Sequence, residues 1–175
     1  IFNSTVVAVC TTVISVSVGS LCAFAVALLN LRGKLLLLGF VLGTLPPGTP
    51  LTFFAGGTGI APLRAMWRQA LADVRDTRVT LVYSARTQGH LAFADELGSM
   101  ARAGAADVSI TLTREAADSD WTGRRGRVDA ALVAGTIDAA RSHAFVCGPP
   151  AFVDHVAARL REAGLDAGRI HLEGW

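Results

Sequence analysis

From residue 51 to its end, the sequence alternates between short apolar runs and longer stretches with helical periodicity. The apolar runs are four to seven residues long. Many of their side chains are β-branched or aromatic, which is typical of buried strands. Strands are predicted at 51–55, 79–84, 107–113, 144–147 and 169–173, and helices at 61–74, 91–103, 128–134 and 149–163. This alternation predicts an α/β fold, a doubly wound five-stranded parallel sheet with helices on both faces.

The order of the predicted strands locates the candidate site. We expect the order 3-2-1-4-5, with the strands numbered along the chain. In open sheets of this kind, ligands bind beyond the carboxyl ends of the strands, at the point where the strand order reverses. Residues that follow the first and fourth strands should therefore meet at a binding site.

Residues 1–50 differ from the rest of the chain, because Arg32 and Lys34 are their only charged side chains. Residues 5–29 are long enough to cross a bilayer, which takes about 20 apolar residues. We therefore predict that residues 1–45 form an apolar, transmembrane helical segment, with a buried soluble helix as the alternative. The two basic residues after it place the following domain in the cytoplasm, anchored to the inner (plasma) membrane. Residues 46–50 are expected to be a Pro/Gly linker.

Charge and cysteine usage exclude two classes of function. Residues 51–175 carry fourteen basic and fourteen acidic side chains, and this neutral balance gives no electrostatic case for nucleic acid. The three cysteines, Cys10, Cys22 and Cys147, lack the spacing of metal ligands, and so do the histidines. We expect no metal site. His155 and Arg159 lie one turn apart, and we expect both on the exposed face of their helix.

A glycine-rich turn joins the first predicted strand to the first predicted helix, in the sequence Phe54-Ala55-Gly56-Gly57-Thr58-Gly59-Ile60-Ala61-Pro62. Glycine lets a backbone approach a bound group closely and adopt positive φ. The start of the helix offers unpaired N–H groups and a partial positive charge to a diphosphate. Thr58 adds a hydroxyl donor. Taken alone, the turn predicts a phosphate site, with a turn that serves only packing as the alternative.

Two further motifs follow strands of the same predicted sheet. Tyr83-Ser84-Ala85-Arg86-Thr87 ends the second strand, and Phe145-Val146-Cys147-Gly148-Pro149-Pro150 ends the fourth. The first motif offers an arginine where an NAD-specific site usually has an acidic residue, and arginine suits a phosphate. The alternatives are an ordinary polar loop at Arg86 and a small buried hydrophobic side chain at Cys147.

With these three motifs in this order, residues 51–175 resemble the NAD(P)-binding domain of the ferredoxin-NADP reductase superfamily. The resemblance implies one cofactor-binding set, in which the first motif holds the diphosphate, the second the adenosine end and the third the nicotinamide: Gly56, Gly57, Thr58, Gly59, Ile60, Pro62, Ser84, Arg86, Arg114, Cys147, Gly148, Pro149 and Pro150. It also places three residues near the point of hydride transfer: Cys147, Glu173 and Trp175. The arginines favour NADP(H) over NAD(H).

The same resemblance implies a function. The domain would bind NAD(P)H for hydride transfer to FAD, and electrons would pass to a ferredoxin-like, iron-sulfur or oxygenase partner. The flavin-binding barrel of the family and its Arg-x-Tyr-Ser/Thr signature do not occur in this sequence. We therefore expect the chain to be inactive alone and to need a flavin domain or flavoprotein partner.

Residues 1–45 resemble a different family. Asn3-Ser4, Thr11-Thr12, Gly19 and Leu31-Arg32-Gly33-Lys34 are similar to a membrane segment of ABC-type sugar permeases. The alternative function is therefore a permease fragment or a chimeric chain with no activity of its own. Residues 40–46 also fit the last strand of a flavin barrel.

Overall fold

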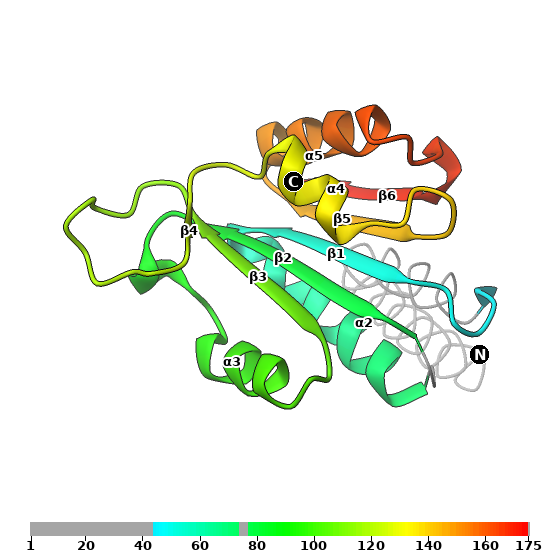
Figure 1. Ribbon diagram of the computed structural model, residues 1–175, viewed down its shortest axis with the longest axis horizontal. Coiled ribbons are helices and arrows are strands. Elements are labelled where there is room, and N and C mark those ends of the chain that lie inside the picture. The colour runs from blue at the N-terminus through cyan, green and yellow to red at the C-terminus, as the bar shows by residue number, and fades with distance from the viewer. Residues whose placement is uncertain (1–43, 74–76, 175) are drawn as a thin grey trace, which may run out of the picture. The chain divides into compact units, whose positions relative to one another are not determined.

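The computed structural model of the chain describes residues 44–73 and 77–174 (Figure 1). The chain divides into two compact units, Ile1–Thr44 and Leu45–Trp175. The predicted membrane segment at residues 5–29, the possible barrel strand up to residue 43, and Trp175 lie outside the described residues. Among the residues that are described, no helix is both long and apolar enough to cross a bilayer.

The second unit is built on one parallel sheet with the strand order β4-β3-β2-β1-β5-β6. The strands are β1 Leu51–Gly56, β2 Val79–Ala85, β3 Asp107–Leu112, β4 Arg124–Arg125, β5 His143–Gly148 and β6 Ile170–Gly174. Leaving β4 aside, the remaining five strands have the predicted order 3-2-1-4-5. The α/β class and the parallel sheet are confirmed.

The prediction of five strands was wrong, because β4 adds a sixth at the edge of the sheet. In β4, Arg124 pairs with Thr111 and Arg125 with Leu112 of β3. From the sequence, no strand is predicted at these two residues. Two exposed arginines carry no apolar alternation from which a strand could be recognised. The pairing brings the loop after β3 back to the sheet, and the Gly126 N–H then donates to the Leu112 carbonyl over 2.8 Å.

Helices cover both faces of the sheet, as predicted (Figure 1). The helices are α2 Ile60–Asp73, α3 Ala94–Arg102, α4 Ala130–Thr136 and α5 Pro150–Glu162. α2 packs on β1, β2 and β5, and α3 packs on β3. α5 packs on β1, β5 and β6 from the other face, where α4 lies against it. All the strand pairings are parallel, so the carboxyl ends of the strands lie at one edge of the sheet.

The central strand β1, which ends at that edge, is held in the core by burial of all six of its residues. Phe54 points into a core cluster with Val146 and with Val156 and Leu160 of α5. Phe53 lies on the opposite face and stacks on Phe145, with ring centroids 5.3 Å apart. A strand with apolar side chains on both faces is typical of a parallel sheet covered on both sides.

Two histidines on the neighbouring strands β5 and β6, His143 and His171, make the stability of the domain depend on pH. The rings of His143 and His171 stack, and Nδ1 of His143 lies 3.1 Å from Nε2 of His171. Burial lowers the pKa of both imidazoles from the usual 6.5. The charge of Arg169 lowers the pKa of His143 further, and His143 does the same to His171. The unfolded chain therefore binds protons more readily than the folded chain.

We predict that the two histidines leave the free energy of unfolding unchanged well above pH 6.5 and lower it as the pH decreases through 6.5 toward their lowered pKa values. The pKa of Asp129 is lowered from 3.8 by the hydrogen bond from the Leu132 N–H. Protonation of Asp129 therefore changes the free energy of unfolding only at a more acidic pH. Replacing His171 with Phe, which keeps a ring against Phe145, should weaken the dependence. Urea unfolding at about pH 5.5 and 7.5 measures it. Equal pH dependence in the wild type and the variant would contradict the assignment.

Candidate nucleotide-binding site

A cavity of about 290 Å³ lies at the carboxyl edge of the sheet, where the strand order reverses between β1 and β5. Its volume is near the lower end of the range for small-molecule sites, about 300 Å³. The ends of three strands, the segment before α4 and the first turns of α5 supply its lining: Gly56, Gly57, Ser84, Ala85, Arg86, Thr113, Arg127, Val128, Pro149, Ala151, Phe152 and His155.

The glycines of the first turn have separate physical roles. Gly57 has a φ of +55°, and a Cβ atom there would meet nothing within 4 Å, so its backbone faces open space in the cavity. A Cβ on Gly59 would lie 2.1 Å from the carbonyl oxygen of Cys147. A Cβ on Gly56 would lie 2.6 Å from the Phe152 ring. Gly56 and Gly59 therefore allow close packing, while Gly57 leaves its backbone accessible to a ligand.

Two helices begin beside this cavity. α2 follows directly on the turn Gly57–Gly59, and α5 begins at Pro150, just after Pro149 of the cavity wall. The first N–H groups of a helix have no partner within the helix, and the helix dipole adds a partial positive charge there. Two helix starts and an open glycine backbone at one cavity suit a bound diphosphate.

Arg86 and Arg127 bring two positive charges to the cavity. Both are exposed, and neither guanidinium group makes a hydrogen bond or ion pair within the part of the chain that the structure describes. Arg124, by contrast, is paired with Asp129. No carboxylate occurs among the described residues that line the cavity. Guanidinium groups without a protein partner are well suited to bind a phosphate.

Of the third motif, Pro149 lies in the cavity wall and the residues before it lie beside the cavity. Cys147 is 1% exposed, and its carbonyl lies against Gly59. In the sheet register, Cys147 is opposite Glu173 of β6. The Oε2 atom of Glu173 is buried and has no hydrogen-bond partner among the described residues. A buried carboxylate oxygen without a partner is unusual, and this one belongs to a residue paired with the predicted nicotinamide turn.

The structure collects part of the predicted set in the cavity wall: Gly56, Gly57, Ser84, Arg86 and Pro149. It leaves the others outside the lining: Thr58, Gly59, Ile60, Pro62, Arg114, Cys147, Gly148, Pro150 and Glu173. Ile60 is buried in the core, and Thr58, Arg114 and Pro150 are exposed. Trp175 lies outside the described residues.

The lining residues that sequence reasoning missed include Arg127, Phe152 and His155. Arg127 comes from the loop that β4 returns to the sheet. Phe152 and His155 lie three residues apart in the helix after the Cys-Gly-Pro turn, a spacing that places them on one helix face. The expectation that His155 is on an exposed face was wrong, since its ring is half-buried and contacts the Val128 carbonyl. The i, i+3 spacing of Phe152 and His155 directly after a predicted binding turn was the sequence signal that could have placed both at the cavity.

Comparisons with known proteins agree with this geometry. Residues 53–158 match the family described as the oxidoreductase NAD-binding domain. The chain is 32% identical over 139 residues to ferredoxin--NADP reductase B of Sorangium cellulosum, covering 74% of this chain and 57% of that protein. It is 30% identical over 124 residues to NADH-cytochrome b5 reductase 2 of Yarrowia lipolytica, covering 69% of this chain and 42% of that one.

A solved structure gives the same result. An Amycolatopsis cytochrome P450 reductase superposes with a TM-score of 0.64 at 28% identity, over 74% of this chain and 40% of that one. The chain therefore spans about half the length, or less, of these relatives. The comparisons do not support the permease resemblance of residues 1–45. With its glycine turn, its cavity at the strand reversal and the match over residues 53–158, the chain belongs to the oxidoreductase NAD-binding domain family, in the form found in ferredoxin-reductase-type oxidoreductases.

Proposed function

We propose that this chain supplies the nucleotide site of an NAD(P)H-dependent flavoprotein reductase whose flavin is held by another domain or protein. When bound, the nicotinamide donates hydride to FAD, and electrons continue to a ferredoxin-like, iron-sulfur or oxygenase partner. The observation that carries the proposal is the cavity at the strand reversal, with the open Gly57 backbone and two unpaired arginines in its wall. The similarity to a ferredoxin--NADP reductase and to a cytochrome P450 reductase supports this kind of partner.

Different residues would bind different parts of the nucleotide. The Gly57 backbone and the start of α2 would hold the diphosphate. Ser84 and Arg86 would hold the adenosine end. Cys147 would seat the nicotinamide through the backbone turn that follows it. Each of these residues binds or orients the nucleotide, so hydride transfer needs no general acid or base from them.

The adenosine end favours NADPH over NADH. NAD-specific sites usually place a carboxylate near the ribose 2′-hydroxyl, and no carboxylate occurs among the described lining residues. Arg86 and Arg127 are both available to a 2′-phosphate, and the Ser84 and Thr113 side chains lie in the same wall. A charge-assisted hydrogen bond is about twice as strong as a neutral one, so the 2′-phosphate should add affinity.

The requirement for a separate flavin domain has a direct test. Ferricyanide reduction with NADPH should be undetectable for the chain alone. The described residues provide a site for the hydride donor, and the flavin that accepts the hydride is held elsewhere in this proposal. Adding the flavin domain of a ferredoxin-reductase-type protein in trans should produce turnover that depends on this chain. A Gly57→Val variant, which would strain the positive φ and fill the open space, serves as the matched control. Turnover by the chain without any flavoprotein would contradict the proposal.

A further inference from the structure

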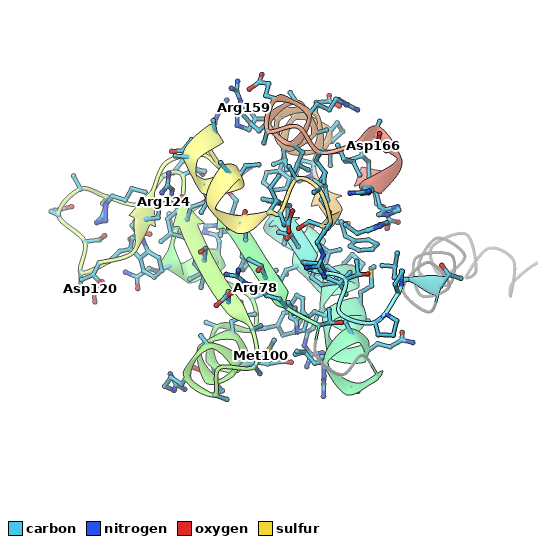
Figure 2. All side chains as sticks on the ribbon, turned by 45° about the vertical axis from the view of Figure 1, so that its right-hand side comes forward. Arg78, Met100, Asp120, Arg124, Arg159 and Asp166 are labelled. Carbon is cyan, nitrogen blue, oxygen red and sulfur yellow. The ribbon has the colours of Figure 1, made fainter. Side chains whose placement is uncertain are left out.

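Residues 126–129 cross the edge of the cavity and are fixed at several points. The Gly126 N–H donates to the Leu112 carbonyl over 2.8 Å, and the Thr111 hydroxyl donates to the Gly126 carbonyl over 2.7 Å. Asp129 then caps α4, its Oδ1 accepting from the Leu132 N–H over 2.8 Å. Figure 2 shows the polypeptide from Asp120, at the outer end of the loop, back to Arg124 beside α4. Arg127 lies between these anchors.

The side chain of His155 adds an anchor from another element. Its Nε2 lies 2.6 Å from the carbonyl oxygen of Val128, the residue that follows Arg127. A carbonyl oxygen only accepts hydrogen bonds, so Nε2 carries the proton and donates. The Val128 side chain is itself buried in the core cluster with Val156 of α5. The carbonyl and the side chain of Val128 are therefore both tied to α5.

Within the described residues, this contact is the hydrogen bond that joins the Arg127 segment to α5, and both partners line the cavity. The other hydrogen bonds of the segment go to β3, to α4 or, through Asp129, to Arg124 of β4. Without the His155 contact, the Val128 carbonyl would lose its partner and the Arg127 backbone would gain freedom toward the cavity. A guanidinium group must lie in one place to bind a phosphate with good geometry.

We propose that His155 is a positioning residue for NADPH over NADH discrimination, acting by fixing the segment that presents Arg127 to the 2′-phosphate. The inference rests on the proposed 2′-phosphate site and deepens it. His155 does not contact the phosphate in this account. Its effect therefore depends on Arg127 and on the presence of the 2′-phosphate, which separates this role from that of a simple cavity wall.

The test measures the affinity of the full chain for 2′-phospho-AMP and for AMP by calorimetric titration. His155→Phe keeps a ring of similar size but removes the N–H donor, and it should weaken 2′-phospho-AMP binding about tenfold with little change for AMP. His155→Gln offers an amide N–H in its place and should recover part of the affinity. In an Arg127→Ala background, His155→Phe should have little further effect, because the two residues act through one contact.

The outcomes separate this inference from the function it rests on. If His155→Phe weakens both ligands equally, or adds fully to Arg127→Ala, His155 is a wall residue and the inference fails. If the wild-type chain binds AMP and 2′-phospho-AMP equally, the NADPH preference fails and the inference with it. Should His155→Phe unfold, as judged by circular dichroism, the same comparison is made with His155→Leu, which also removes the N–H donor. A ligand-independent effect in that variant would likewise overturn the inference.

Discussion

Replacing Gly59 with Ala should destabilise the domain by about 3 kcal/mol, the upper part of the range for inserting atoms into a well-packed site. The added Cβ would lie 2.1 Å from the Cys147 carbonyl oxygen and 2.5 Å from its carbon. Both are backbone atoms of β5, so relief requires the first turn of α2 to move away from the sheet. That movement would also open the turn at Gly57, and nucleotide binding should be lost with stability.

The chain offers a matched control for this variant. Gly135 lies in α4, and a Cβ there would meet nothing within 4 Å. Alanine is a better helix former than glycine, so Gly135→Ala should be neutral or stabilising by up to about 1 kcal/mol. Urea unfolding followed by circular dichroism measures both variants. Similar midpoints for Gly59→Ala and Gly135→Ala would show that the turn does not need close contact with β5.

Replacing Arg86 with Ala should weaken 2′-phospho-AMP binding about tenfold to a hundredfold, since a hydrogen bond to a charged group contributes about 1.5–3 kcal/mol. AMP lacks the 2′-phosphate, so its affinity should change much less. The Arg86 guanidinium group lies in the cavity wall without a partner among the described residues, so its removal leaves no protein group unpaired. The loss therefore reports the contact with the ligand.

Arg161 provides the control for this second variant. It is exposed near the end of α5 and does not line the cavity, yet its removal changes the net charge equally. Arg161→Ala should leave both affinities nearly unchanged, because exposed charges at a distance are screened by salt. An equal loss in the two variants would assign the effect to the overall field of the domain. An equal loss for AMP and 2′-phospho-AMP would remove Arg86 from the 2′-phosphate site.

The fold was predictable from the sequence wherever burial leaves a periodic pattern. β1, β2 and β5 are buried, and their apolar runs stand out between polar or glycine-rich segments. The rule that ligands bind where the strand order reverses then predicted the edge of the sheet at which the cavity lies. Glycine positions were predictable too, although their separate roles needed the positions of Phe152 and Cys147.

The missing parts depend on contacts between distant segments. The choice between Arg114 and Arg127 depends on the path of the loop after β3, and that path depends on the two-residue pairing of β4. The role of His155 depends on the rotation of α5 about its axis. That rotation follows from the packing of Val156 and Leu160 in the core and not from the local sequence around His155. The roles of such side chains can be recognised only in the folded structure, where the sheet and helices are packed together.

Calorimetric titration of the full chain with NADP⁺ tests the central claim most directly. The account predicts saturable binding at a single site, displaced by 2′-phospho-AMP, with weaker binding of NAD⁺ and loss of binding in Gly57→Val. The absence of saturable binding for both NADP⁺ and NAD⁺ would contradict it. So would binding that 2′-phospho-AMP does not displace, because the nucleotide would then lie outside the cavity at the ends of β1 and β2.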